Sequence, residues 1–338
     1  MRIFIVIAIL LILISGCIRR ERSLIANEDR PYELVLPAGF PMPEIPEDNQ
    51  LTHYRVELGK LLFHDTRLSR DETISCASCH LQSEAFADHE PLAVGIDNRV
   101  GMRNTPTLTN VAYNDRFFAD GGVPSLELQV LAPIPNENEH DFTTLEIIER
   151  LKDDDQVQMM SSLAYGREFD GYVITRAIAS YERTLISGNS RFDQFYFQGM
   201  DDALTQQELD GWNLFQENQC ASCHSGFNFT DNSYHNIGQY EAYEDAGRER
   251  ISMDEADNGK FKTPTLRNIE LTAPYMHNGS METLEDVVDF FNTGGVGHVN
   301  QDELITPLDL TSSEKESLIA FLKTLTDYEF VTNPEFQP

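Results

Sequence analysis

The pentapeptide Cys-Ala-Ser-Cys-His occurs twice in this chain, at residues 76–80 and again, unchanged, at residues 220–224. These two copies contain four of the five cysteines. A disulfide framework does not require a histidine after each cysteine pair, and a single zinc site does not require two identical copies so far apart. The repeat therefore indicates that the chain binds the same chemical group twice.

That group is identified by the spacing within the repeat. Two cysteines three positions apart share one face of a helical turn. Each thiol can then form a thioether with a vinyl group of one porphyrin, and the following histidine can bind the iron. The motif thus predicts two covalent haem c groups, attached at Cys76, Cys79, Cys220 and Cys223, with His80 and His224 as iron ligands. Zinc at the first pair, or a redox dithiol at either pair, would not explain the duplicated histidine.

The sequence around the two motifs is duplicated as well. Three patterns occur in the same order beside each copy: Gly-x-x-Leu-Phe at 59–63 and 211–215, Phe-x-Asp at 86–88 and 229–231, and Thr-Pro-Thr-Leu-x-Asn at 105–110 and 263–268. Matched features in a fixed order indicate a duplicated structural unit. We expect an N-terminal domain at 50–198 and a C-terminal domain at 199–338, each resembling a small cytochrome c.

Apolar residues recur at helical spacing in three stretches, namely 174–185, 284–291 and 318–325. Residues 311–314 (Thr-Ser-Ser-Glu) are typical of a capping box at the start of the last helix. Strand patterns are few, so the expected fold is mainly α, with two cytochrome c-like domains that each carry one covalent haem c. Residues 143–200 have no counterpart in the second half, and we expect them to form bridging helices.

The N-terminus has a short basic start, an apolar run over residues 3–14, and then Ser-Gly-Cys at 15–17. The run is shorter than the roughly 20 residues that a membrane-spanning helix requires, and it is typical of a secretion signal. Small residues before a cysteine resemble a bacterial lipobox, which predicts a signal peptide at 1–16 and lipidation of Cys17. An ordinary cleaved signal and an uncleaved anchor are the alternatives.

The predicted anchor sets the expected location of the protein. Proline-punctuated residues 17–49 are expected to be an extended tether. We expect the protein to lie in the periplasm or on another extracytoplasmic face, anchored to a membrane by lipid. The absence of Asp after Cys17 favours the outer membrane where the cell has one.

Acidic residues outnumber basic ones by 56 to 25, which gives a formal net charge of −31. Affinity for nucleic acid comes mostly from basic residues that meet phosphates, so this composition argues against nucleic acid as a partner. It favours a partner with a basic docking face, because complementary charge speeds encounter.

Six further segments complete the pattern, at residues 68–69, 103–108, 117–121, 181–188, 262–268 and 271–277. Together with the two haem motifs, their order resembles the bacterial dihaem cytochrome c peroxidase family, including relatives that oxidise protein tryptophans to tryptophylquinone. The resemblance implies that the N-terminal haem reduces hydrogen peroxide. It also implies that the C-terminal haem accepts electrons from a small c-type cytochrome or cupredoxin.

The resemblance also implies a set of catalytic residues. It places the family's distal glutamate at Glu139, its distal glutamine at Gln129 and its loop proline at Pro133. A carboxylate above the iron can take a proton from the near peroxide oxygen and return it to the far one, so that water leaves. Gln129 would orient the peroxide by hydrogen bonding.

Calcium and self-association are further implications of the resemblance. A calcium ion between the domains would be bound by Asn104 and by the carbonyl oxygens of Thr272 and Pro274, because oxygen donors suit that cation. Homodimers are common in the family, although no interface can be identified from this sequence.

Two departures from the family pattern concern the first haem. The family's dissociable distal histidine follows a glycine, but here Gly95 is followed by Ile96, which cannot bind iron. We therefore expect a first haem that is five-coordinate or water-bound and needs no reductive activation. The family's tryptophan between the haems is Ala119, which leaves Phe117, Phe118 or direct tunnelling for electron transfer.

A third departure concerns the second haem, whose distal methionine or tyrosine in the family falls at Phe291. Phenylalanine offers no ligand. His298, beside a glycine-rich bend, is the first replacement candidate and Met276 the second.

The expected function is reduction of hydrogen peroxide to water, with electrons that pass from the His224 haem to the His80 haem. One alternative is an enzyme that uses peroxide to oxidise a protein side chain, which the missing distal histidine favours and the missing tryptophan opposes. Another is a non-enzymatic electron-transfer cytochrome. It would need a sixth ligand on the first haem, and none is evident.

Overall fold

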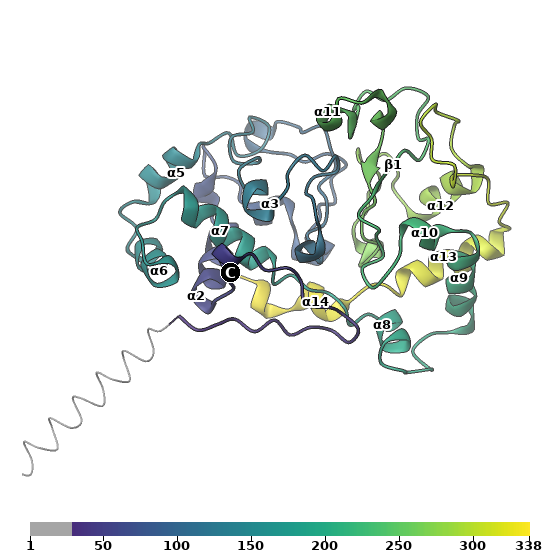
Figure 1. The fold of residues 1–338 in the computed structure, drawn as a ribbon, viewed down its shortest axis with the longest axis horizontal. Helices are drawn as coiled ribbons and strands as arrows, with labels where there is room; N and C mark the ends of the chain where they lie inside the picture. Colours follow the sequence, from purple (N-terminus) through teal and green to yellow (C-terminus); the bar gives the residue numbers. More distant parts are fainter. Residues whose placement is uncertain (1–28) are drawn as a thin grey trace, which may run out of the picture.

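The computed structural model describes residues 29–338 as a mainly helical protein with a single short ribbon of two strands (Figure 1). The helices of the first half are α2 (His53–Phe63), α3 (Cys76–Cys79), α4 (Leu126–Gln129), α5 (Thr144–Leu151), α6 (Asp155–Tyr165) and α7 (Gly171–Glu182). Those of the second half are α8 (Arg191–Tyr196), α9 (Gln206–Glu217), α10 (Cys220–Cys223), α11 (Glu249–Ser252), α12 (Leu284–Thr293), α13 (Ser312–Lys323) and α14 (Tyr328–Thr332). The mainly α prediction is confirmed. The predictions for residues 1–16 and Cys17 lie outside the described residues.

Local signals in the sequence account for the ends of several helices. The predicted capping box opens α13, where the Thr311 hydroxyl accepts from the Glu314 N–H and the Glu314 carboxylate accepts from the Thr311 N–H. An equivalent box opens α12, and Gly294 ends that helix with a φ of 81°. In the described residues, no helix has both the length and the apolar composition that a membrane span needs.

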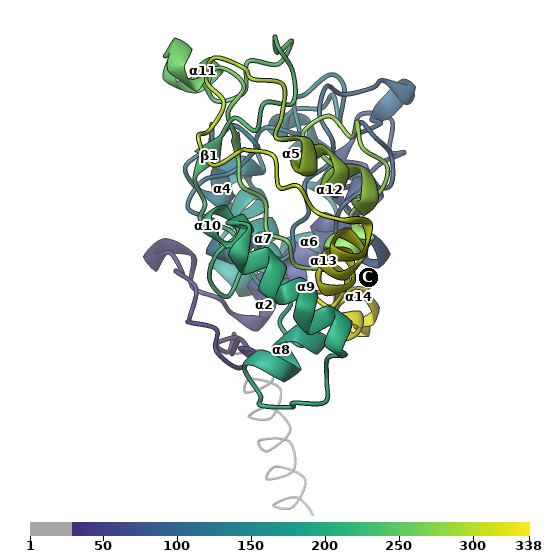
Figure 2. The same ribbon diagram turned by 90° about the vertical axis from the view of Figure 1, so that its right-hand side faces the viewer.

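The two halves share the same helix crossing. In the first half α2 packs on α7, and in the second half α9 packs on α13. Figure 2 shows the second of these pairs in front. A Cβ added at Gly59 would lie 1.9 Å from the Ala177 carbonyl oxygen, and one at Gly211 would lie 1.9 Å from that of Ser317. The glycine that begins each duplicated Gly-x-x-Leu-Phe pattern therefore permits the backbones of two helices to approach closely.

Helix α7 consequently belongs to the first half rather than to a bridge. Its buried residues Val173, Ile174 and Ile178 join the same hydrophobic core as Leu58 and Leu62 of α2, and α5 and α6 contribute to that core as well. The prediction that residues 143–200 form bridging helices is therefore wrong for α5, α6 and α7. Sequence similarity did not reveal that α7 is the structural equivalent of α13, because the two helices share packing geometry rather than residues.

Two hydrophobic cores form the interior. The second core contains Phe192 of α8, Phe215 of α9 and Phe321 of α13. Phe330 and Phe336 near the C-terminus pack in the first core, so the chain returns to the first half after α13. In Figure 1 this yellow segment runs from α13 through α14 towards α2.

Two asparagines of the Thr-Pro-Thr-Leu-x-Asn repeats join the halves reciprocally. Asn110 donates to the Asn228 side chain at 3.0 Å, and Asn268 donates to the Thr109 hydroxyl at 3.3 Å. The side-chain oxygen of Asn110 also accepts a hydrogen bond from the backbone N–H of Ser187, which follows α7. In the same way, the side-chain oxygen of Asn268 accepts from the backbone N–H of Asp327, which follows α13. The duplicated motif therefore builds the contact between the halves.

The described part of the proline-punctuated segment, residues 29–49, is packed against the body rather than extended away from it. Phe40 is buried, with ring contacts to Tyr113 and Phe227 from the two halves. Asn49 is also buried and donates to Glu127 at 2.8 Å. The tether prediction is wrong for these residues because aromatic burial and buried hydrogen bonds fix them.

Candidate functional site

Each Cys-Ala-Ser-Cys-His motif forms a single helical turn that ends at its histidine. In α3 the Ser75 and Ser78 side chains and backbone form a capping box, and in α10 the chain enters through Gln219, whose φ is 63°. All four cysteines of the two motifs are partly buried and are free of disulfide bonds. The thiols thus remain available for thioether formation.

The two motif histidines have the tautomer that an iron ligand needs. His80 Nδ1 lies 2.8 Å from the carbonyl oxygen of Phe86, and His224 Nδ1 lies 3.1 Å from that of Phe229. A carbonyl can only accept, so Nδ1 carries the proton and Nε2 keeps its lone pair. Burial also lowers the pKa of His80 to about 4, so the ring stays neutral. The residues present therefore fit covalent haem with axial histidine.

The duplicated patterns outside the motifs hold these carbonyls in place. Phe86 and Phe229, the first residues of the two Phe-x-Asp patterns, both have positive φ, at 59° and 50°. The second threonine of each Thr-Pro-Thr sequence supports the same loop, since Thr107 donates to the Ala85 carbonyl at 2.5 Å and Thr265 to that of Asn228 at 2.6 Å. The sequence showed these repeats, but only the fold shows that they orient the proximal histidines.

Glu139 lies beside the first motif. Burial raises the pKa of the Cys79 thiol to about 12, and the nearby negative charges of Asp88 and Glu139 add to this rise. The Cys79 Sγ atom also lies 3.9 Å from the carbonyl oxygen of Val94. The segment after Val94 packs directly on Glu139, because the Ile96 N–H donates to the Glu139 carbonyl at 3.1 Å. A Cβ at Gly95 would lie only 2.6 Å from the Glu139 Cα. Gly95 thus allows this close approach.

The carboxyl group of Glu139 is oriented by a residue that sequence reasoning missed. Asn136 Nδ2 donates to Glu139 Oε1 at 2.6 Å. Burial raises the pKa of Glu139, and the Asn136 hydrogen bond partly opposes that rise. A carboxyl group whose pKa is raised takes up a proton more readily than an exposed glutamate and can still release it, as acid–base chemistry requires.

The other two predicted catalytic residues lie on the same stretch of chain. Gln129 ends α4 and is partly buried. The Pro133 carbonyl accepts from the backbone N–H groups of Asn136 and His140, each at 3.3 Å, and so closes the loop that carries Glu139. Asp141, the next residue of that loop, pairs with Arg70 at 2.5 Å and Arg99 at 3.0 Å.

Comparison with known proteins agrees with this geometry. Residues 53–202 match the model of a family described as di-haem cytochrome c peroxidase. The cytochrome-c peroxidase IdrP2 of Denitromonas iodatirespirans is 36% identical over 84% of this chain and 85% of its own length. The chain belongs to the di-haem cytochrome c peroxidase family. It is therefore an oxidoreductase of the peroxidase type, and the family implies two haem c groups.

Proteins named MauG are related to this chain at a similar level of sequence identity. The methylamine utilization protein MauG of Methylorubrum extorquens is 37% identical over 86% of this chain and 84% of its own length. A crystal structure of a MauG-like protein associated with microbial copper homeostasis superposes with a TM-score of 0.86, is 33% identical, and covers 90% of this chain and 98% of its own. This di-haem peroxidase thus has both peroxidases and MauG proteins among its relatives.

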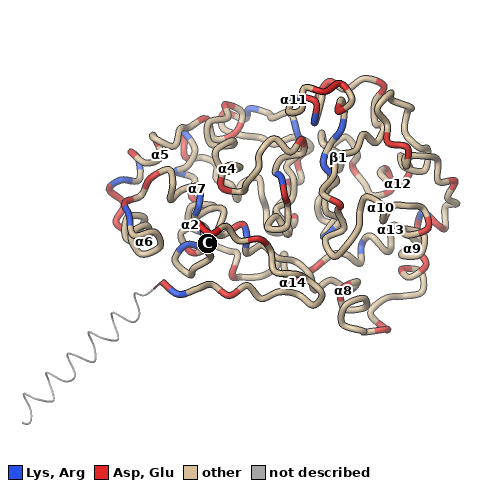
Figure 3. Tube along the Cα trace, in the orientation of Figure 1, with Lys and Arg blue, Asp and Glu red and all other residues tan. Residues whose placement is uncertain are grey.

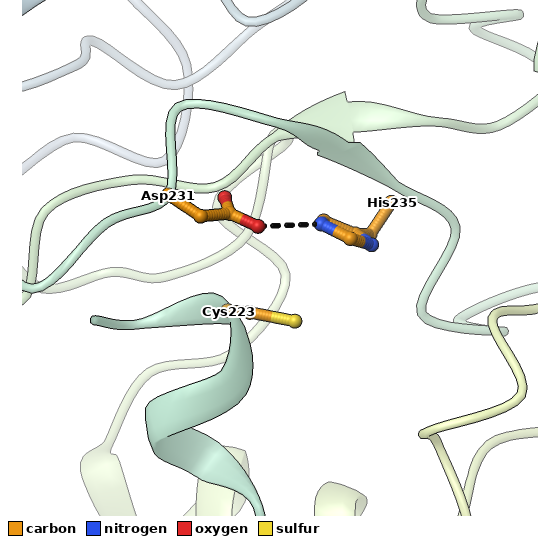
Figure 4. Close-up of side chains that lie close together, drawn as sticks. All are labelled: Cys223, Asp231 and His235. Atoms are coloured by element: carbon orange, nitrogen blue, oxygen red, sulfur yellow. Dashed lines mark hydrogen bonds and ion pairs between the residues drawn. The ribbon is translucent and has the colours of Figure 1, made fainter.

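In this di-haem peroxidase, His235 lies close to Cys223 of the second motif and to Asp231 (Figure 4). Its Nδ1 lies 2.7 Å from Asp302 and its Nε2 lies 3.0 Å from Asp231. The Cys223 sulfur, together with these two carboxylates, raises the pKa of His235. Haem attachment would convert the Cys223 thiol to a thioether, so that only the contribution of the two carboxylates to the raised pKa would persist.

His298 and Met276, the candidate distal ligands of the second haem, differ in their surroundings. The backbone N–H of Asn300 donates to His298 Nδ1 at 3.0 Å, and Asn236 lies 3.1 Å from the same atom. Nδ1 is therefore an acceptor, so the proton of the neutral ring is on Nε2, which then has no lone pair for a metal. Met276 has a φ of 73° in the sharp turn before Gly279.

The three residues of the predicted calcium site lie near a contact between the halves. The Asn104 N–H donates to the His277 carbonyl at 2.9 Å. The side-chain nitrogen Nδ2 of Asn104 donates hydrogen bonds to the carbonyl oxygens of Glu90 and Pro91. The side-chain oxygen Oδ1 is therefore the Asn104 atom that could bind a calcium ion. Pro274 is joined to Ala273 by a cis peptide bond, and Thr272 is the residue before that pair.

Proposed function

We propose that this protein reduces hydrogen peroxide to water with electrons from a small redox protein, a c-type cytochrome or a cupredoxin. The electrons would enter at the haem of His224 and pass singly to the haem of His80. When bound, the first haem supplies an iron that accepts peroxide and the oxidising equivalents released by its cleavage. The partly buried Glu139 carboxyl beside the first motif is the observation that carries this proposal.

The chain's own residues would move one proton. Glu139 takes it from the iron-side oxygen of peroxide and returns it to the outer oxygen, which leaves as water. Asn136 holds the Glu139 side chain, and Gln129 orients the peroxide. Pro133 acts indirectly, because its carbonyl accepts the two hydrogen bonds that close the loop.

Stopped-flow mixing of oxidised and half-reduced holoprotein with peroxide, followed by reduced cytochrome c, tests the proposal. Rapid change of the first haem's absorption and catalytic oxidation of the cytochrome would support it. A rapid haem change with sluggish cytochrome oxidation would instead support oxidation of a protein side chain. The absence of any reaction with peroxide would overturn both.

Oxidation of a protein side chain is a second candidate function. Ile96 supports it, because the position of the dissociable histidine is occupied by an apolar residue. The similarity to MauG proteins, one of them a MauG-like protein associated with copper homeostasis, supports it as well. Mass spectrometry of candidate partner proteins after peroxide treatment would detect an added oxygen or a lost pair of hydrogens.

We propose Met276 before His298 as the distal ligand of the second haem, which reverses the order expected from the sequence. The hydrogen bonds to His298 Nδ1 are the reason. A near-infrared band typical of methionine-to-iron charge transfer, lost in Met276→Leu and kept in His298→Gln, would support this order.

Calcium binding by Asn104, Thr272 and Pro274 remains a proposal, supported by the free oxygen of Asn104. Removal of calcium by a chelator should lower the thermal stability of the protein and slow its reaction with peroxide. Elemental analysis of purified protein gives the direct test.

The N-terminal sequence and the negative charge of the chain support proposals for the protein's location and for its electron-donor partner. Cleavage after residue 16, lipid on Cys17 and an extracytoplasmic, membrane-anchored position are proposed, with the outer membrane favoured. Acidic residues are spread over both halves (Figure 3), which supports a donor protein with a basic docking face. Domains at 50–198 and 199–338, and a homodimer, are proposed on the family resemblance.

A further inference from the structure

Phe86 and Phe229, whose carbonyl oxygens accept the protons of the two motif histidines, have equivalent surroundings in the two halves. The centre of the Phe86 ring lies 6.3 Å from that of Phe63 in α2. In the same way, the Phe229 ring lies 6.1 Å from Phe215 in α9. A further ring covers Phe229, because Phe192 of α8 lies 5.3 Å from it. Aromatic rings from several helices therefore pack around the residue that orients a motif histidine.

The rings that cover Phe86 come from the end of the chain. Phe330 of α14 and Phe336 lie 5.5 Å and 5.8 Å from Phe86, measured between ring centres, and all three side chains are buried. Helix α14 follows α13 and packs in the first core, just as α8 follows α7 and packs in the second core. Each half is thus completed by a short helix that follows the helix pair of the other half. Residues 327–336, here called the return segment, complete the first half.

Hydrogen bonds as well as rings hold the return segment on the first half. Gln82 Nε2 donates to the carbonyl oxygens of Phe330 at 3.0 Å and Asn333 at 2.8 Å. The Tyr181 hydroxyl of α7 is buried and donates to the carbonyl oxygen of Phe336 at 3.0 Å. These bonds join side chains of the first half to the backbone of the return segment, so they fix the path of the segment itself.

Gln82 lies two residues after His80 and begins the loop that leads to Phe86. The Ala85 N–H donates to the Gln82 carbonyl at 3.0 Å, and Ala85 and Phe86 have φ values of 53° and 59°. A residue with a side chain keeps a positive φ only where the surrounding structure imposes it. The return segment contributes to this constraint, because it binds Gln82 at the start of the loop and covers Phe86 at its end.

We propose that Phe330, Phe336 and Gln82 are positioning residues for the axial histidine of the first haem. They fix the Phe86 carbonyl that accepts the Nδ1 proton of His80 at 2.8 Å. Such a hydrogen bond orients a ligating histidine and raises its basicity towards the metal. A segment that follows the last helix pair of the chain therefore sets the strength of the bond between His80 and iron. The inference rests on haem binding at His80, which the family implies, and not on which haem reduces peroxide.

The test uses holoprotein variants whose two haems are first counted by pyridine haemochrome assay. Phe330→Ala removes a ring from Phe86. Gln82→Leu removes the two hydrogen bonds donated to the return segment, and it opens no cavity in the core because Leu occupies a similar volume at this partly buried position. Resonance Raman spectroscopy of the fully reduced protein reports the stretching frequency of the bond between iron and His80. Redox titration gives the reduction potential of each haem.

Both variants should lower the stretching frequency of the bond between iron and His80, because a loosened Phe86 carbonyl leaves the histidine a weaker ligand. A weaker ligand stabilises oxidised iron less. At a fixed potential the first haem should therefore shift towards its reduced form about tenfold, which is 59 mV for one electron. The potential of the second haem should not move.

Three matched variants serve as controls. Tyr328→Ala removes a ring from the exposed side of α14, where Tyr328 is 60% exposed, and should leave both haems unchanged. Gln206→Leu repeats the Gln-to-Leu exchange at an exposed position of α9 and should have no effect either. Phe192→Ala uncovers Phe229 instead of Phe86, so it should shift the potential of the second haem and leave that of the first in place.

An unchanged stretching frequency and an unchanged first-haem potential in Phe330→Ala and Gln82→Leu would overturn the inference. Equal shifts of both haems in Gln82→Leu would overturn it as well, because they would report general loosening rather than a path to His80. If Phe330→Ala loses a haem, Gln82→Leu decides alone. Each of these results leaves the proposed peroxide reaction standing.

Discussion

The backbone N–H of Ile96 donates a hydrogen bond to the carbonyl oxygen of Glu139 at 3.1 Å. The family resemblance places a dissociable histidine ligand of the classical peroxidases at this position, after a glycine. Here it is a buried isoleucine that packs on the residue proposed to move the proton. The loop that contains Gly95 and Ile96 thus packs against Glu139 and supports it.

Replacement of Ile96 by histidine should restore a ligand to the first haem. The oxidised Ile96→His protein is expected to show a low-spin, bis-histidine signal that the wild type lacks, and to react with peroxide only after partial reduction. Electron paramagnetic resonance and stopped-flow absorption measure the two effects. Ile96→Val is the control, and a bis-histidine signal in the wild type would contradict the assignment.

Glu139→Gln should slow the reaction of the first haem with peroxide by about 10²- to 10⁴-fold, because the amide cannot transfer the proton. Glu137→Gln, two residues away and exposed, provides the matched control and should leave the rate unchanged. Stopped-flow absorption under excess peroxide gives both rates. Equal rates in the two variants would remove Glu139 from the mechanism.

The same carboxyl group should determine the acid limb of the pH profile. Burial raises the pKa of Glu139, and the proton-accepting form is the ionised one. The rate of peroxide reaction is therefore expected to fall as the pH drops through a value above the ordinary range of an exposed glutamate. Single-turnover rates measured over a range of pH test this prediction. In Glu139→Gln the fall in rate at low pH should be absent.

Glu182 should make stability depend on pH. Burial raises its pKa to about 8, with the Glu127 carboxylate adding to the rise and Arg183 opposing it, and one of its oxygens has no hydrogen-bond partner. A carboxyl group whose folded pKa lies above its unfolded value stabilises the fold fully at low pH. That stability is lost as the pH rises through about 8.

Because each pKa unit corresponds to about 1.4 kcal/mol, the loss should amount to a few kcal/mol between pH 5 and pH 9. Denaturant unfolding at these two pH values should therefore show Glu182→Gln gaining on the wild type as the pH rises. Glu168→Gln, at an exposed position, serves as the control. An identical pH dependence in wild type and Glu182→Gln would contradict the prediction.

The helix crossings should be equally sensitive to added volume in both halves. Gly59→Ala and Gly211→Ala each place a Cβ 1.9 Å from a carbonyl oxygen of the facing helix. Overpacking of this kind costs about 1–3 kcal/mol, so both variants should unfold at lower denaturant concentration. Asn213→Ala, at an exposed site of α9, should cause no such loss, and stable glycine variants would show that the crossings are looser.

The sequence by itself was enough to predict the chemistry of the two motifs. Covalent attachment and axial ligation need only five consecutive residues, so Cys76, Cys79 and His80 could be assigned without a fold. The capping box at Thr311 was equally local and was found where expected. Family resemblance added Glu139, whose acidic neighbourhood gave no reason by itself to choose it over Glu137.

Tertiary structure decided what depends on residues far apart in the chain. Glu139 differs from Glu137 because Gly95 lets another segment pack on it, and Phe86 orients His80 because Thr107 supports the intervening loop. The pairing of α7 with α2, and the junction of Tyr234 with Gly121, likewise join positions separated by about a hundred residues. No local pattern encodes such contacts, because burial and hydrogen bonding between distant segments arise only when the whole chain is packed.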